Sequence, residues 1–313
     1  MKIGLASAIA GIPTKKVITG YGGIERVVSD LAQAFNKAGH ETVVAGYLGT
    51  DVGDVNIELK DEYALSSTTI DCDVLFDFSH VKSARGKKKY SIPMFTDNIG
   101  TNPIFPSRAV KYAFGNSEWA QWGPVIPMGI KIPQRIKTYK DKGFCYVGRL
   151  SRIKGLDLIA YLIEEAELQI EIAGYLDKFD EAYATNFIDM ARSYGIPVKT
   201  NVSSHDIYKL LAESSYFIFD PTWQILFGAR AVESFGLTAV EALSQNTTIL
   251  TGNKPSGVRE IIGNAGYIMD GLSDWNNFIR DPLPIKNAIS RVGYYSSDRY
   301  AEDLLDVATR DNG

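Results

Sequence analysis

Short apolar segments alternate along the chain with longer amphipathic ones, and this alternation restricts the fold more than any other feature. Apolar runs predict buried strands at residues 2–7, 41–46, 73–78, 91–95 and 112–116. Residues 24–37 predict an amphipathic helix that ends at Gly39. Strands that alternate with helices form parallel sheets covered by helices on both faces. The first half therefore predicts an open parallel α/β sheet.

The same alternation restarts after a proline-rich, irregular stretch at residues 124–139. Strands are predicted at residues 143–147, 168–173, 198–200, 216–219, 248–251 and 265–268. Helices are predicted between them at residues 156–165, 181–194, 204–213 and 238–244. A last helix, residues 298–309, has Asp298 at its start and Arg310 near its end, which suits the helix dipole. The second half therefore predicts a second doubly wound sheet.

The chain has 313 residues, and single cores stop growing near ~250–300 residues, so we predict two domains. The first Rossmann-like domain comprises residues 1–132 and is completed by the C-terminal helix, residues 296–313. Residues 133–295 form the second Rossmann-like domain. Ligands bind at the carboxyl ends of strands in open α/β sheets, so the expected site is the cleft that the two domains face.

Composition excludes several classes of protein. No apolar run reaches the ~18 residues that a membrane span needs, and the apolar N-terminus fits a buried first strand better than a signal peptide. The net charge of −4 argues against a nucleic-acid binder. Two distant cysteines, Cys72 and Cys145, and three histidines form no metal or disulfide framework. We therefore expect a cytoplasmic protein without a metal or other cofactor.

A local basic run lies at residues 85–89, beside Tyr90. Such runs are usually solvated surface. The run also fits an anionic ligand or a weak peripheral contact with the inner membrane surface, and the sequence leaves these alternatives open.

One strand-to-helix loop carries two cations. The strand that ends in Gly148 is followed at once by Arg149, and Lys154 with Gly155 opens the next helix. Arginine offers a planar fork to two oxygens and lysine a mobile point charge, which suits a diphosphate. The alternative is that both are surface charges. Cations at a helix start oppose the helix dipole, however, so an anionic partner is the better explanation.

The first loop of the chain ends in Gly22 and Gly23, directly before a predicted helix. Such glycines let backbone amides approach an anion, although many loops use them merely to turn. The loop lacks the third glycine of G-x-G-x-x-G and lies far from its strand, which argues against NAD binding.

Two carboxylates near the end of the chain, Glu233 and Glu241, are eight positions apart around a Phe-Gly-Leu-Thr turn. A capping box from Thr238 to Glu241 would by itself explain Glu241. Alternatively, Glu233 and the amides of residues 235–237 face the same cleft as Arg149 and Lys154. Carboxylates hold sugar and ribose hydroxyls well, so this alternative predicts a nucleotide-sugar site.

Five segments together resemble a known family. They read GGIER, VIPMGI, VGRLSRIKGLDL, IAG and ESFGLTAVEALS followed by VREII, in the expected order from Gly22 to Ile262. The sequence is thus similar to family 4 of the retaining glycosyltransferases, which have the GT-B fold. The resemblance implies transfer of a sugar from a nucleoside diphosphate sugar to a hydroxyl acceptor, with retention and without a metal. It also implies a C-terminal helix that crosses back to the first domain.

The resemblance implies roles for individual residues. Arg149 and Lys154 would bind the diphosphate, Glu233 the donor sugar and Glu241 the ribose. The remaining donor-binding residues would be Gly22, Gly23, Gly148, Gly174, Phe235, Gly236 and Leu237.

This sequence departs from the family in the first domain, where members often carry a histidine that contacts the donor sugar. Either His80 fills that role from a shifted position or Asp97 replaces it. A catalytically silent nucleotide-sugar-binding partner subunit and a GT-B sugar phosphorylase therefore remain alternatives. Trp223, Phe227 and Arg230 shape the sugar or acceptor pocket or serve packing. No motif in the sequence specifies the base, the sugar, the acceptor or the oligomeric state.

Overall fold

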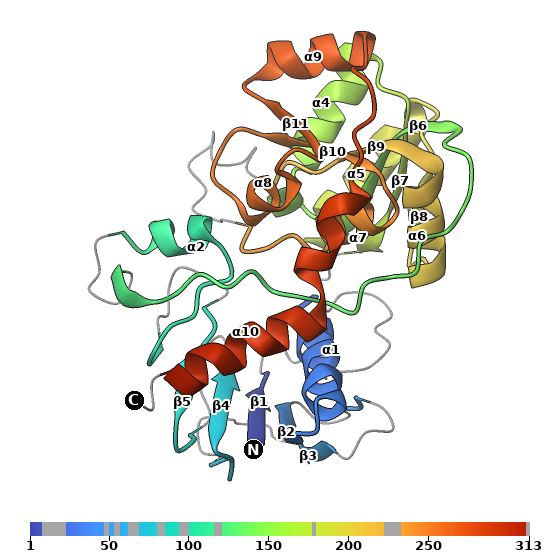
Figure 1. Cartoon of the computed structure of the whole chain (residues 1–313). Coiled ribbons are helices and arrows are strands. Elements are labelled where there is room, and N and C mark those ends of the chain that lie inside the picture. The colour runs from blue at the N-terminus through green and yellow to red at the C-terminus, as the bar shows by residue number, and fades with distance from the viewer. Residues whose placement is uncertain are drawn as a thin grey trace. The chain divides into compact units, whose positions relative to one another are not determined.

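The computed structural model describes residues 1–7, 23–46, 50–52, 57–61, 69–79, 85–93, 100–115, 121–176, 180–221 and 233–310. These residues divide into two compact units. The first contains the described residues up to Lys131 and those from Tyr294 onward, and the second is Ile132–Gly293. Each unit has its own parallel sheet (Figure 1). The predicted α/β class with two parallel sheets is confirmed.

The first sheet has five strands in the order β3-β2-β1-β4-β5. Its strands are β1 (Lys2–Ala6), β2 (Glu41–Gly46), β3 (Ile57–Asp61), β4 (Val74–Asp77) and β5 (Lys89–Ser91). All of its pairings are parallel. Side chains on both faces of the central strands are fully buried, as the consecutive residues Val43 and Val44 show, because helices and loops cover both faces.

Helix α1 (Gly23–Lys37) packs against β1, β2 and the C-terminal helix α10 (Ser297–Arg310), which lies across it in Figure 1. The chain leaves this unit after Lys131 and returns to it at Tyr294, and hydrogen bonds join these two segments. The amide of Ile130 donates to the carbonyl of Tyr295 at 3.0 Å, and the Asp30 carboxylate accepts from the amide of Lys131 at 2.9 Å. Asp30 therefore fixes the segment that ends at Lys131 to α1.

The second sheet has six strands in the order β11-β10-β9-β6-β7-β8. They are β6 (Lys142–Leu150), β7 (Ile170–Leu176), β8 (Val198–Thr200), β9 (Ser214–Ile218), β10 (Thr248–Gly252) and β11 (Gly266–Met269). All of its pairings are parallel as well.

The helices around this sheet form two groups, and within each group neighbouring helices contact one another. The first group is α4 (Leu156–Ala166), α5 (Glu181–Ser193) and α9 (Leu272–Arg280). The second is α6 (Ser204–Glu213), α7 (Leu237–Ser244) and α8 (Gly257–Ile262). The short 3₁₀ turn η2 (Arg152–Lys154) belongs to this unit, and the 3₁₀ helix η4 (Ile289–Tyr295) begins in it and ends in the first unit. Parallel crossovers are right-handed, so the two groups cover opposite faces of the sheet.

Three local predictions need correction. Residues 112–116 do not begin a strand, because helix α2 (Arg108–Ala113) starts at Ser107, whose hydroxyl accepts from the Val110 amide at 3.2 Å. Strand β3 was not predicted, because its sequence IELKD has no continuous apolar run. Strand β5 begins before the predicted residues 91–95, with Lys89.

The basic run at residues 85–89 is partly used inside the first unit. The Lys88 ammonium donates to the carbonyl of Ala308 at 2.7 Å, where a cation complements the C-terminus of α10. Lys89 pairs with the buried Asp77 at 2.8 Å. Two of the four cations therefore have structural partners.

Candidate functional site

The second sheet reverses its strand order between β6 and β9. From β6 the chain adds β7 and then β8 on one side, and it returns with β9 on the other side of β6. Loops at the carboxyl ends of two such strands diverge, which leaves room for a ligand. The loop after β6 and the segment after β9 therefore mark the candidate site within this unit.

Strand β6 is longer than predicted and includes Arg149. Arg149 is opposite Tyr175 in the register of β6 and β7, and Gly148 is opposite Gly174. A Cβ on Gly174 would lie 2.3 Å from the carbonyl oxygen of Gly148, so a side chain there would push the strands apart. Glycine at position 174 therefore keeps the two strands in contact where the predicted cation begins the loop.

Gly155 closes the loop against the segment after β9. Its φ of 80° lies in the left-handed region, and it caps the start of α4. A Cβ at this position would lie 2.2 Å from the carbonyl oxygen of Asp220, which follows β9. Only glycine permits both the conformation and the approach, so Gly155 determines where Lys154 lies.

The buried side chain of Tyr146 contacts the backbone of this loop at two places. Its hydroxyl lies 3.0 Å from the carbonyl oxygen of Arg149 and 3.4 Å from that of Lys154. The side chain has no exposure, and burial raises the pKa of its hydroxyl far above the usual range, so it stays protonated and can donate. One buried hydroxyl therefore connects the backbone of both predicted cations.

The outer part of the loop is held by α5. The Arg152 guanidinium lies 4.8 Å from the ring centroid of Tyr183, and the Tyr183 hydroxyl donates to Asp157 at 2.6 Å. Burial and the neighbouring Asp157 carboxylate raise the pKa of Tyr183. These contacts fix Arg152, whose side chain is exposed to solvent. The other two cations of the loop, Arg149 and Lys154, are partly buried.

Lys154 and Glu233 form an ion pair between the loop after β6 and the segment before α7. Both side chains are largely buried, with 22% and 13% exposure, and the ammonium also lies 5.9 Å from the ring centroid of Phe219. The carbonyl of Glu233 accepts from the Gly257 amide at 2.8 Å. The backbone of Glu233 is thereby fixed to the start of α8.

The N-terminus of α7 has no side-chain cap. Its cap is Gly236, with a φ of 99°, and the Ala239 amide donates to the Gly236 carbonyl at 3.0 Å, so the amides of Leu237 and Thr238 are the ones without a partner within the helix. The predicted capping box is wrong, because Thr238 lies inside the helix rather than at its cap. Glu241 is buried one turn further in, with 7% exposure. Its burial needs another explanation than capping.

The structure thus brings together several residues predicted from the sequence. Lys154 and Glu233 are in contact, and Arg149 is linked to Lys154 through Tyr146. Phe235, Gly236 and Leu237 form the start of α7, and Gly23 begins α1 in the first unit. Gly22, His80 and Asp97 lie outside the described residues, as do Trp223, Phe227 and Arg230.

The sequence interpretation did not identify Tyr146 or Gly257. A signal for Tyr146 exists, because residues i and i+2 of a strand share a face and Gly148 follows at that spacing. A Cβ on Gly148 would lie 3.0 Å from the Tyr146 hydroxyl oxygen. Gly257 gave no such signal, because its closeness to Phe235 depends on how α7 and α8 pack.

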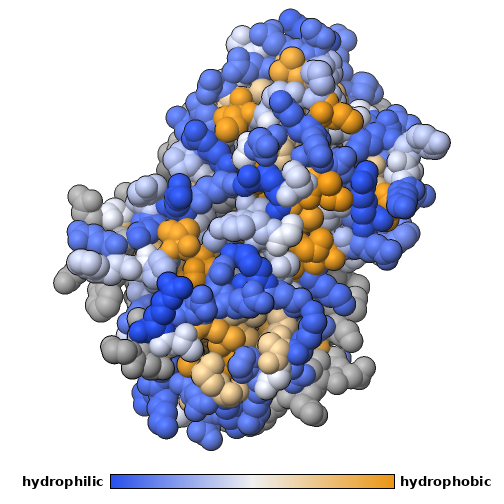
Figure 2. All heavy atoms as spheres, viewed as in Figure 1, coloured by the Kyte–Doolittle hydropathy of each residue, from blue (hydrophilic) through white to orange (hydrophobic). Residues whose placement is uncertain are grey.

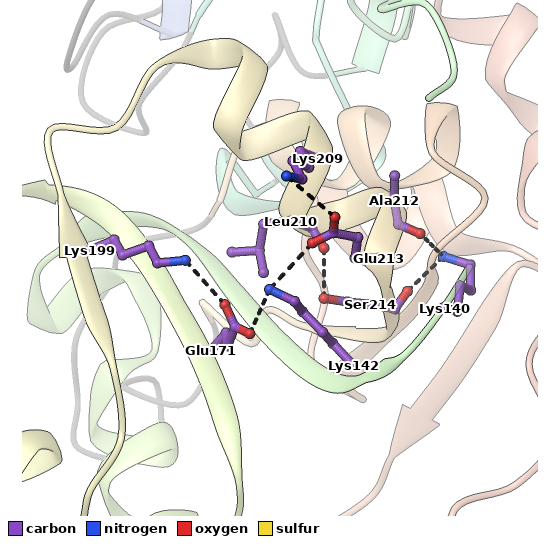
Figure 3. Close-up of polar contacts among 9 residues, drawn as sticks. All are labelled: Lys140, Lys142, Glu171, Lys199, Lys209, Leu210, Ala212, Glu213 and Ser214. Atoms are coloured by element: carbon purple, nitrogen blue, oxygen red, sulfur yellow. Dashed lines mark hydrogen bonds and ion pairs between the residues drawn. The ribbon is translucent and has the colours of Figure 1, made fainter. Parts of the chain in front are cut away.

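The opposite, amino-terminal edge of the same sheet carries a different cluster of charges (Figure 3). The Lys142 ammonium lies 2.6 Å from a Glu171 oxygen and 3.3 Å from a Glu213 oxygen. Nearby, Lys140 donates to the carbonyls of Ala212 and Ser214 at the end of α6, and burial lowers its pKa to about 8. These contacts join strands to helix ends, so this cluster serves the fold.

Two classes of feature were not found in the described part of the chain. No group of three or more potential metal ligands of the His, Cys, Asp or Glu type occurs there. No helix within those residues is long and apolar enough to span a membrane. On the face shown in Figure 2, apolar residues occur in separate patches among hydrophilic ones.

Part of the chain matches the sequence model of a known protein family. Residues 130–280, slightly under half of the chain, match the family model of glycosyl transferases group 1. The match contains Arg149, Lys154, Glu233 and Glu241. No curated protein matches the sequence.

Solved structures are similar over almost the whole chain. AviGT4, a glycosyltransferase involved in avilamycin A biosynthesis, has a TM-score of 0.73 at 20% identity, covering 98% of this chain and 96% of its own. Alr3699/HepE of Anabaena, solved with UDP and glucose, has a TM-score of 0.69 at 14% identity, and the match covers 99% of this chain and 100% of that protein's chain. A sucrose-phosphate synthase from Thermosynechococcus elongatus has a TM-score of 0.70 at 13% identity, and the match covers 98% of each chain. At these identities the likeness shows the fold, which confirms the GT-B class.

Proposed function

We propose that the protein is a glycosyltransferase that moves a sugar from a nucleoside diphosphate sugar to a hydroxyl acceptor, with retention of anomeric configuration and without a metal ion. The observation that carries the proposal is the contact between Lys154 and Glu233 beside the braced Arg149 loop. Cations suited to phosphates and a carboxylate suited to hydroxyls thereby occur in one site. Retention rests on the resemblance to family 4.

Arg149 and Lys154 bind the diphosphate in this proposal. As the glycosidic bond breaks, negative charge grows on the departing nucleoside diphosphate. Cations held in place before the reaction stabilise that charge without rearrangement, and loss of one such donor costs roughly 100- to 1000-fold in rate. The bracing of their loop by Tyr146 and Gly155 supports this role. In this proposal the two cations supply the positive charge at the diphosphate without a metal ion.

Glu233 accepts hydrogen bonds from the sugar, and the N-terminus of α7, which has no side-chain cap, directs its first amides at the sugar or phosphate. Glu241 binds the ribose. Its burial inside α7 supports a role other than solvation of the surface.

A binding experiment tests the proposal. The thermal unfolding midpoint is measured with UDP, GDP, ADP and dTDP, each with and without EDTA, for the wild-type protein and for Lys154→Ala. A ligand at ~100 times its dissociation constant stabilises the folded state by ~2.7 kcal/mol, which raises the midpoint by several degrees. UDP is the first probe, because a protein of similar fold was solved with UDP.

We expect one nucleotide to raise the midpoint of the wild-type protein, equally with EDTA, and to leave Lys154→Ala unchanged. Consumption of the corresponding nucleotide sugars in the presence of hydroxyl acceptors then identifies a transferase. A shift that requires inorganic phosphate would instead favour a phosphorylase. Binding without turnover by any acceptor would favour a silent partner subunit. No shift with any nucleotide would contradict the diphosphate site itself.

A further inference from the structure

The two groups proposed to bind opposite ends of the donor are already bound to each other. The ammonium of Lys154, assigned to the diphosphate, pairs with the carboxylate of Glu233, assigned to the sugar. Within the described part of the chain, Glu233 is the carboxylate that neutralises Lys154. Without a donor, each charge therefore has a partner in a largely buried place.

Other ion pairs of the same unit are built differently. Lys142 shares its charge between Glu171 and Glu213, and Glu171 is also 3.4 Å from Lys199 (Figure 3). That network joins neighbouring strands to the end of α6, and Lys142 and Glu171 each have two partners in it. The Lys154–Glu233 pair instead connects two loops at the edge of the sheet where the donor is proposed to bind, so a ligand can separate it without breaking secondary structure.

We infer that the Lys154–Glu233 pair is exchanged on donor binding, so that the site prefers a complete nucleotide sugar to a nucleoside diphosphate. This inference rests on the proposed function. The diphosphate oxygens replace Glu233 at the Lys154 ammonium, and the sugar hydroxyls replace Lys154 at the Glu233 carboxylate. Both charges keep a partner when the whole donor binds.

A nucleoside diphosphate without sugar cannot complete this exchange. If it takes Lys154, it leaves the carboxylate of Glu233 largely buried without a cation, which is costly. If Glu233 keeps Lys154, the diphosphate loses a contact. In either case the product of the reaction binds less tightly than the donor, and re-formation of the ion pair assists its release.

The inference makes an unusual prediction for Glu233→Gln, a variant of nearly the same size without the charge. Removal of the carboxylate frees the Lys154 ammonium, so the nucleoside diphosphate should bind about tenfold tighter or more. The matching nucleotide sugar should gain less, because the variant weakens the contact with its hydroxyls. The ratio of the two affinities should therefore fall towards one.

The test is calorimetric titration of the wild-type protein, Glu233→Gln and Glu233→Asp. The probes are the nucleotide among UDP, GDP, ADP and dTDP that gives the largest thermal shift, and its glucose conjugate. Glu171→Gln is the matched control, because it removes a carboxylate from lysine pairs at the opposite edge of the sheet. It should leave both affinities unchanged. Circular dichroism checks that each variant is folded, and Glu233→Asp, which keeps the charge on a shorter side chain, should give a smaller gain.

The outcomes separate this inference from the proposed function. If the wild-type protein binds none of the four nucleotides, the proposed function fails. If the wild-type protein binds one of them but Glu233→Gln binds it no more tightly, the exchange is overturned and the diphosphate site remains. An equal gain for the Glu171→Gln control would also overturn it, because the effect would then be one of overall charge.

Discussion

The Tyr146 hydroxyl lies 3.0 Å from the carbonyl oxygen of Arg149, three residues further along the same strand. A strand residue normally has its carbonyl in the ladder, so a side-chain donor at this place marks the point where β6 becomes a loop. The same hydroxyl reaches the carbonyl of Lys154. The position of two proposed phosphate-binding side chains thus depends on one buried tyrosine.

Tyr146→Phe tests this dependence, because it keeps the buried ring and removes the donor. Loss of a hydrogen bond of this kind costs about 0.5–1.5 kcal/mol, and we expect affinity for the nucleoside diphosphate to fall by up to roughly tenfold. Titration with the nucleotide identified above measures it. If the loop also shifts in the transition state, kcat falls more than KM rises.

Tyr300→Phe is the matched control for this change. Tyr300 is also fully buried, and within the described part of the chain its hydroxyl has no hydrogen-bond partner. Its removal should leave nucleotide binding unchanged and should not lower the unfolding free energy. Equal losses in both variants would mean that the Tyr146 hydroxyl has no positioning role.

Arg149→Ala should reduce turnover of the nucleotide sugar by roughly 100- to 1000-fold with little change in the unfolding midpoint. The reason is that the guanidinium meets charge that develops in the transition state. Steady-state kinetics measure this loss. Arg152→Ala, three residues along, removes a cation that stacks on Tyr183 instead, and turnover should stay within a few-fold of wild type. A normal rate for Arg149→Ala would exclude Arg149 from the mechanism.

Gly155→Ala should destabilise the second unit and displace Lys154. The new methyl group would meet the carbonyl oxygen of Asp220 at 2.2 Å in a backbone with a φ of 80°. Gly195→Ala is the control, since Gly195 has a φ of 75° and no heavy atom within 4 Å of the added Cβ. The left-handed backbone costs ~1–2 kcal/mol in both variants, and the contact should add about 1–3 kcal/mol to Gly155→Ala alone. Urea unfolding measures the difference, and equal losses would contradict the close approach.

Glu25 should make the stability of the protein depend on pH. Burial in the first turn of α1 raises its pKa from 4.5 to about 7. Between pH 4.5 and pH 7 the folded state therefore binds more protons than the unfolded state, and the unfolding free energy falls as the pH rises through this window. Above pH 7 the buried carboxylate carries its full cost, about 3 kcal/mol at most.

Glu25→Gln removes that cost. The variant should unfold at a higher temperature than wild type at pH 8, and the gain should shrink to near zero at pH 4.5. Midpoints measured at several pH values give both curves. Parallel curves for the two proteins would show that Glu25 is not responsible for the pH dependence.

Much of the fold could be predicted because apolar periodicity is a local property. Strand β2 (Glu41–Gly46), strand β8 (Val198–Thr200) and helix α6 (Ser204–Glu213) have the predicted bounds. The apolar run at residues 112–116 misled the prediction, because a run that short fits either a strand or a helix and the Ser107 cap decides for the helix. The charged strand β3 forms through its ladder with β2, which no local pattern reveals.

Two parallel α/β sheets could be predicted from the sequence alone. The sequence also predicts the chemistry of the candidate site, with two cations at a strand end and a carboxylate shortly before a helix that follows a glycine. These follow from residue type and spacing along one strand or helix. The three-dimensional arrangement was needed to show that Lys154 pairs with Glu233, that the Tyr146 hydroxyl reaches both ends of the loop and that Gly155 closely approaches Asp220. Those contacts join residues whose separation in the sequence carries no information about distance, because strand order and helix packing bring them together.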